Sequence, residues 1–168
     1  MVKVFGIGLA FVLAACSPAE SGAALSQSQS NEASVSETET RTHPVSGLEI
    51  IEVTVMRGEQ EIIFKTELAD TSEAQARGLM FRTELADDEA MIFPTQMPQQ
   101  RSFWMKNTPL SLDLIFVGED NRITNIAANA VPYSLESIPS AGLAIAVVEV
   151  RGGLASELGI VPGDKVTW

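Results

Sequence analysis

The sequence predicts an α+β fold that is mainly β, with a compact, barrel-like sheet of antiparallel or mixed strands and two or three short helices. Short segments rich in β-branched and aromatic residues recur over residues 48–168, and turn residues separate them. Helix-type spacing is confined to brief stretches, and the chain contains no internal repeat. Many strands with few short helices indicate an α+β or mainly β domain.

The first elements of this domain are expected to be two strands within residues 48–69. Apolar residues alternate with other side chains over 51–56, which is the period of a strand, and residues 57–60 supply the turn. A short helix should follow, because Ser72 and Gln75 have the spacing of a capping box and Gly78 is placed to end the helix. A second short helix or turn is expected over 83–89.

The rest of the domain is expected to alternate strands with short connections. Residues 90–93 should form a strand that ends at Pro94, with a loop over 95–100. A short helix is expected near 154–158. Further strands are predicted at 102–107, 112–118, 122–131, 144–150 and 165–168.

The first fifteen residues have the layout of a secretory signal peptide: one cation, a short apolar run and small residues before Cys16. The run is too short to span a bilayer, which takes roughly 20 apolar residues. The sequence Leu-Ala-Ala-Cys at 13–16 resembles the bacterial lipobox, and this resemblance implies that Cys16 carries lipid. We therefore expect export across the inner membrane and anchoring by lipid. Ser17 favours the outer membrane, facing the periplasm.

Residues 16–47 are expected to be the lipidated cysteine and a disordered tether. The segment is rich in Ser, Glu, Ala, Gln and Thr and has few large apolar residues. Such a composition buries too little surface to offset the entropy of ordering the chain. The folded domain is therefore predicted to span residues 48–168.

Composition excludes several classes of function. The formal net charge of −11 disfavours nucleic acid as a partner. A single histidine, His43, and a single cysteine exclude a histidine-based triad and an intrachain disulfide, and no cofactor or metal site of the usual His and Cys kind is expected. Thioethers can bind Cu(I), so copper binding stays open through four methionines, at positions 80, 91, 97 and 105.

The segment 101–116 combines charged and bulky apolar residues. As a strand, residues 102–107 would place Trp104 and Lys106 on one face. Asp113 follows among apolar residues on both faces, so we expect it to be buried. A buried carboxylate needs a cation or backbone donors, and Lys106, Arg82 and Arg77 are candidates. The carboxylate is then either architectural or part of a binding or acid–base site.

Several blocks together resemble the domain of unknown function 192 family: ARGLMFR (76–82), MIF (91–93), FWMKNTPLSLDLIFV (103–117), ITNI (123–126) and GIVPGDKV (159–166). One departure is Ala90, where the family usually has glycine before the methionine. The resemblance runs from about Leu48 to the C-terminus and implies no particular reaction. Separately, GIVPGDKV is similar to the Gly-Asp box of cradle-loop β-barrels, which implies a structural turn at Gly163 and Asp164.

Three hypotheses of function follow. The first is a membrane-anchored envelope lipoprotein that binds a small ligand or an envelope protein. The second is a hydrolase- or transferase-type enzyme that uses Lys106 and Asp113. The third is a methionine-based copper carrier. The binding site of the first hypothesis would use Arg82, Trp104, Lys106, Asn107 and Asp113.

Overall fold

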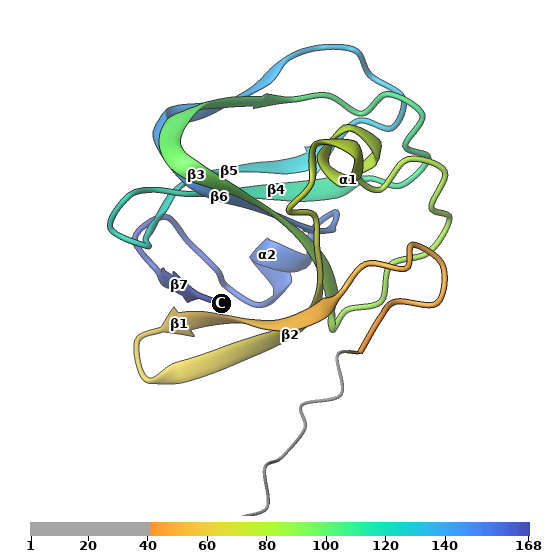
Figure 1. Ribbon diagram of the computed structural model, residues 1–168. Coiled ribbons are helices and arrows are strands. Elements are labelled where there is room, and N and C mark those ends of the chain that lie inside the picture. The colour runs from red at the N-terminus through yellow and green to blue at the C-terminus, as the bar shows by residue number, and fades with distance from the viewer. Residues whose placement is uncertain (1–40) are drawn as a thin grey trace, which may run out of the picture. The chain divides into compact units, whose positions relative to one another are not determined.

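Seven strands form one curled sheet, a half-barrel, in the computed structural model (Figure 1), which describes residues 41–168. Two short helices accompany the sheet. The predicted mainly β class is therefore confirmed. The elements, in chain order, are β1 (Ile50–Arg57), β2 (Gln60–Leu68), α1 (Ser72–Arg77), β3 (Glu89–Phe103), β4 (Leu112–Val117), β5 (Ile123–Ala130), β6 (Ile138–Arg151), α2 (Leu154–Glu157) and β7 (Lys165–Thr167).

The sheet is mixed, with strand order β5-β4-β6-β3-β2-β1-β7. Strands β2 and β3 pair in parallel, and α1 lies in the connection between them. The other neighbours pair antiparallel. Strand β6 lies between β4 and β3, and its residues 146–150 are buried on both faces of the sheet.

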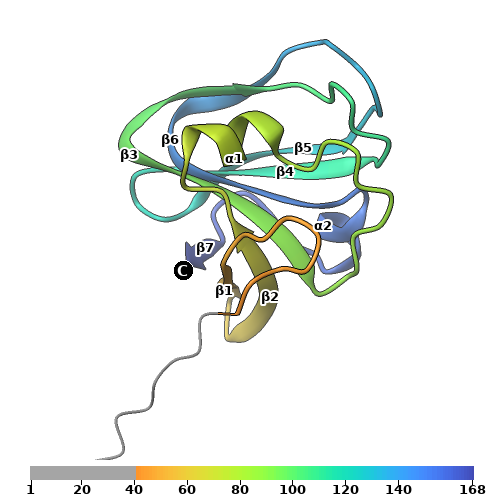
Figure 2. The ribbon, with the colours of Figure 1, turned by 45° about the vertical axis from the view of Figure 1, so that its right-hand side comes forward.

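Two hydrophobic clusters fill the two faces of this sheet. One contains Val148 and Val150 of β6 together with Leu154 of α2. The other contains Val147 of β6 together with Ala74 of α1. Figures 1 and 2 accordingly place α1 and α2 on opposite sides of β6. Every residue of β4 is buried, as expected for a strand covered on both faces.

The segment before β4 differs from the prediction. Strand β3 does not end at Pro94 but continues through the predicted loop to Phe103, paired with β6. A shift of register between Pro94 and Gln99 accommodates the proline, which cannot donate to a regular ladder. The predicted strand at 102–107 is wrong beyond Phe103, because the chain turns there: the Thr108 N–H donates to the Met105 carbonyl and Asn107 has φ of +54°.

The two helix predictions after β2 had different outcomes. Helix α1 forms, with Thr71 as its N-cap, and Gly78 follows it at φ of +50°. Of the short helix or turn expected at 83–89, the described structure has the turn, at 87–88, and loop precedes it. The Glu89 carboxylate accepts the Ala86 N–H at 3.1 Å, which stabilises a turn in place of helical hydrogen bonds.

Residues 41–47, which precede Leu48, pack against the domain. Thr42 bridges to Glu49, and the Ile50 N–H donates to the Arg41 carbonyl at 2.7 Å. Residues 41–47, assigned above to the end of the tether, therefore form a turn against the domain. The predicted signal peptide, Cys16 and the predicted tether as far as residue 40 lie outside the described residues. Within residues 41–168, no helix is both long and apolar enough to cross a bilayer.

Candidate functional site

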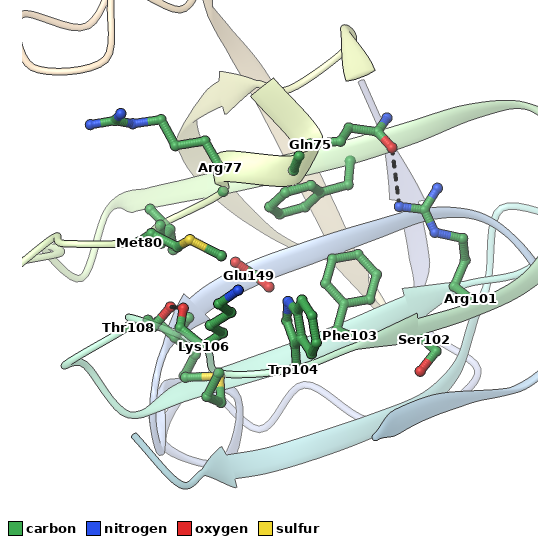
Figure 3. A pocket seen from close by; sticks show the side chains of 16 residues that line it. Gln75, Arg77, Met80, Arg101, Ser102, Phe103, Trp104, Lys106, Thr108 and Glu149 are labelled. Carbon is green, nitrogen blue, oxygen red and sulfur yellow. Dashed lines mark hydrogen bonds between the residues drawn. The ribbon is translucent and has the colours of Figure 1, made fainter. Parts of the chain in front are cut away.

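A pocket of about 320 Å³ lies on the face of the sheet that carries α1 (Figure 3). Its walls come from α1, from the end of β3 and from the turn at 104–108, and β6 contributes its base. The polar and aromatic side chains among its lining residues are Gln75, Arg77, Phe93, Arg101, Ser102, Phe103, Trp104, Lys106, Thr108 and Glu149.

Glu149 is the buried carboxylic acid of this pocket. It lies on β6 between Met91 of β3 and Leu114 of β4, and only 5% of its surface is exposed. Burial among these apolar neighbours raises the pKa of Glu149 to about 8, and no hydrogen bond or ion pair within the described residues offsets that effect. The carboxyl group is therefore mainly protonated at neutral pH and can donate a hydrogen bond into the pocket.

Two basic side chains lie beside the base of the pocket. Figure 3 shows the Lys106 amino group and the Glu149 carboxyl group pointing toward each other. The Lys106 Nζ also lies 5.3 Å from the centroid of the Trp104 ring, a cation–π arrangement. On the other side, Arg101 stacks over Phe103 and donates to the Gln75 side chain at 3.3 Å. Partial burial lowers the pKa of Arg101.

Strained backbone gathers around the turn that carries Lys106. Phe81, Asn107 and Tyr133 all have φ between +54° and +65°, which costs non-glycine residues energy. They lie on adjoining segments: the Phe81 N–H donates to the Asn107 carbonyl at 2.8 Å, and the Tyr133 N–H donates to the Thr108 carbonyl at 3.1 Å. Such strain is concentrated at functional sites in many proteins. The three segments therefore fix the position of the turn at one side of the pocket.

Residues 53–168 match DUF192, a family described as uncharacterized ACR. The chain belongs to the DUF192 family. The family resemblance stated from the sequence is therefore confirmed for the domain.

Two crystal structures are similar to this DUF192 chain. A protein of unknown function from Novosphingobium aromaticivorans is 57% identical, with a TM-score of 0.75, and the match covers 76% of this chain and 91% of that one. A Sinorhizobium meliloti protein, whose name suggests a transcription regulator, is 33% identical, with a TM-score of 0.67 and coverage of 69% and 91%. A search of curated proteins found no match.

The DUF192 domain brings together only part of the predicted site. Trp104 and Lys106 line the pocket. Asn107 adjoins it and donates to the Met80 sulfur at 3.8 Å. Arg82 lies elsewhere and pairs with Glu67 at 2.7 Å.

Asp113 is fully buried, as predicted, but it lies on the other face of the sheet. It shares that face with Ile115 and Val117, whereas its neighbour Leu112 lines the pocket. Its carboxylate accepts three backbone N–H bonds of 2.7–2.9 Å, from Asn129, Gly153 and Ala155. Loop amides therefore hold it, and the Lys106–Asp113 pair of the enzyme hypothesis is not assembled.

Glu149 is not among the site residues predicted from the sequence. The residue is the single charged side chain in the run 144–150, the most β-rich segment of the chain. A carboxylate in the middle of a strand that reads as buried on both faces is itself a signal of a functional group or a buried pair. The argument that predicts a partner for the buried Asp113 carboxylate applies equally to Glu149.

The predicted turn residues and methionines have distinct positions. Gly163 has φ of +100°, and the Asp164 carboxylate accepts the Val161 N–H at 2.9 Å. The four methionines do not share one site: Met80 and the buried Met105 line the pocket, Met91 is buried in the core and Met97 is exposed on β3. Among residues 41–168, no group of three His, Cys, Asp or Glu side chains is placed to hold a metal.

Proposed function

We propose that this chain is a lipid-anchored envelope lipoprotein whose DUF192 domain binds a small ligand in the pocket above Glu149. One observation carries the proposal for the pocket: a carboxyl group is buried at the base of an open cavity, and no hydrogen bond or ion pair within the described residues offsets the effect of burial on its pKa. Neither Glu149 oxygen is an enclosed, unpartnered atom of the described chain, so the carboxyl group opens onto the cavity. A bound ligand would contact the carboxyl group there.

The surroundings of Glu149 support a binding role over a purely architectural one. A leucine at this position would pack against Met91 and Leu114 without a desolvation cost. The other buried carboxylates of the described chain differ, because Glu67 pairs with Arg82 and Asp113 binds three amides. Proteins often retain such a locally unfavourable group where function requires it.

Binding can be tested by thermal-shift screening of a library of small metabolites against the soluble domain. Compounds that raise the melting temperature of the wild type should lose their effect on Glu149→Leu, which fills the base of the pocket with an apolar side chain. Glu52→Leu, at an exposed position on β1, is the matched control and should respond like the wild type. A library in which no compound distinguishes Glu149→Leu from the wild type would overturn the binding proposal.

Anchoring rests on the lipobox-like sequence at Cys16 and is tested separately. Cells that express the full chain should incorporate labelled palmitate into the wild type and not into Cys16→Ser, which should leave the membrane fraction. Without acylation of the wild type, the lipoprotein part of the proposal fails and the pocket part stands.

A second candidate function is acid–base catalysis by Glu149. Its pKa of about 8 lies near neutral pH, where a side chain can both give and take a proton efficiently. Glu149→Gln would then abolish turnover of a substrate and retain its binding, whereas a pure binding protein turns over none of the compounds found in the screen. The Sinorhizobium relative is named as a transcription regulator, but direct binding of DNA would fit this chain poorly because its net charge is −11.

A further inference from the structure

We infer that the pocket selects ligands with an oxyanion, a carboxylate or phosphate group, which binds between Lys106 and Glu149 while the apolar part of the ligand lies against Trp104. This inference rests on the proposed binding function and specifies the chemistry of the ligand. Charge distribution, unpaired cations and a proton donor at the base of the pocket support it.

The pocket has the opposite charge balance to the rest of the chain. Acidic residues outnumber basic ones by 22 to 11 in the whole sequence. The pocket lining, in contrast, contains Arg77, Arg101 and Lys106 but a single acidic residue, Glu149, which is mainly protonated. A cavity that is positive within an acidic protein attracts anions and disfavours cationic ligands.

The basic side chains of the pocket are not held in ion pairs with acidic side chains of the described chain. Within residues 41–168, the ion pairs of lysine and arginine use Lys65, Arg82 and Arg151, and none involves a basic residue of the pocket. In Figure 3 the Arg77 guanidinium extends away from Glu149, whereas Lys106 points toward it. Lys106 is therefore the primary partner for an anion, and Arg101 lies on the opposite side of Trp104.

Glu149 can bind the same anion only while it carries a proton. The charged groups on the elements around it are basic: Arg77 on α1, Arg101 on β3 and Lys106 on the turn. On β4 its neighbour is apolar Leu114. A protonated carboxyl donates a hydrogen bond to a ligand oxygen, and a deprotonated one repels the anion. With a pKa of about 8, binding should therefore weaken about tenfold for each pH unit above that value.

The aromatic wall of the pocket fits the apolar part of such a ligand. The Trp104 side chain is 53% exposed although it is large and apolar, and its ring lies beside Lys106. Phe103 and Met80 line the same cavity. A flat or aliphatic group can cover these surfaces while its oxyanion reaches Lys106, which removes apolar area from water.

Four probes of similar shape test the inference: benzoate, phenyl phosphate, benzylamine and benzyl alcohol. Binding is followed at pH 6.5 through the indole N–H resonance of Trp104, assigned with Trp168→Phe. At least one of the two oxyanions should bind, and benzylamine should not. The oxyanion that binds more tightly identifies the carboxylate or phosphate class. Lys106→Met should weaken oxyanion binding at least tenfold, and Lys165→Met on β7 should leave it unchanged.

The pH dependence gives an independent readout. Wild-type affinity for the oxyanion should fall between pH 7 and pH 9, whereas Glu149→Gln, whose amide keeps its donor, should bind equally at both. Preference for benzylamine or benzyl alcohol would overturn the oxyanion class and leave the pocket as a binding site. No binding of any probe at millimolar concentration would also overturn it, and the library screen would then decide the proposed function separately.

Discussion

The Arg82 Nη1 atom lies 2.7 Å from the Glu67 Oε1 atom, and their side chains are only 13% and 3% exposed. Glu67 and Glu149 occupy one row across the sheet, because both pair with Met91, Glu67 on β2 and Glu149 on β6. The two glutamates are thus separated by a single strand, roughly 10 Å from Cα to Cα. Glu67 has an arginine partner and is architectural. Glu149 faces the pocket and is the candidate ligand-binding carboxylate.

Loss of Arg82 should strongly destabilise the fold. Arg82→Ala would leave Glu67 buried without its partner, and Glu67 Oε2 already lacks a hydrogen bond in the described structure. We expect a loss of roughly 3–5 kcal/mol in the free energy of unfolding, measured with urea at pH 7. Lys65→Ala is the matched control: it breaks an ion pair of the same 2.7 Å length whose side chains are 72% and 56% exposed, and it should change little. Equal losses in the two variants would contradict this assignment.

Asp113 should prove architectural. Asp113→Ala leaves the N–H groups of Asn129, Gly153 and Ala155 without their acceptor, so we expect a loss of at least about 3 kcal/mol, on the basis of 1–3 kcal/mol for each unsatisfied buried group. Its effect on ligands should be small, because the pocket lies on the other face. If an Asp113→Ala variant loses ligand binding under conditions in which it is fully folded, Asp113 belongs to the site after all.

Stability should depend on pH through Glu149. The pKa of this group is raised by burial from 4.5 to about 8, so the native state holds a proton that the unfolded state releases between those values. The free energy of unfolding should therefore fall by several kcal/mol as pH rises from about 4.5 to about 8, and then level off. Glu149→Gln removes this titration, so its stability relative to the wild type should increase from pH 5 to pH 8.5. The control Glu52→Gln should follow the wild-type profile, and an unchanged slope in Glu149→Gln would refute the raised pKa.

The turn at residues 41–47 should contribute to stability. A chain that begins at Leu48 lacks the Arg41 carbonyl that accepts the Ile50 N–H, and it also lacks His43, whose Nε2 lies 3.4 Å from Arg82 Nη2. Its melting temperature should be more than about 5 °C below that of a chain that begins at Arg41, equivalent to roughly 1 kcal/mol. Calorimetry of the two chains at the same pH measures this difference. Identical melting temperatures would restore the boundary predicted at residue 48.

Periodicity and composition predicted the mainly β class and the position of most strands, because alternation and β-branched runs reflect local packing. They failed at residues 94–107. Pro94 and the polar stretch after it are typical of a loop, but pairing with the long strand β6 extends β3 through a register shift to Phe103. At 83–89, where a short helix or a turn was expected, the chain forms a turn, since local hydrogen bonds such as that from the Ala86 N–H to the Glu89 carboxylate replace helical ones.

The candidate site was less predictable than the fold, because it depends on pairing between distant segments. The sequence identified Trp104 and Lys106 but joined them to Asp113, whose side chain faces the opposite side of the sheet. Neighbouring strand positions alternate between faces, so an error of one residue in register moves a side chain to the other face. Glu149 joins the pocket only through the register of β6 with β3 and β4, which no local pattern encodes.

The two end strands of the sheet, β5 and β7, meet at one end through a bridge between Arg122 and Lys165. Strand β7 has only three residues, and the Asn125 side chain of β5 bonds to the backbone at Pro139 and Ala141. Unpaired strand edges can recruit the edges of neighbouring molecules and start aggregation. If Cys16 carries lipid as proposed, the protein is concentrated in two dimensions, where copies collide often in similar orientations. A sheet with occupied edges would then let copies of this domain crowd a membrane surface without polymerising.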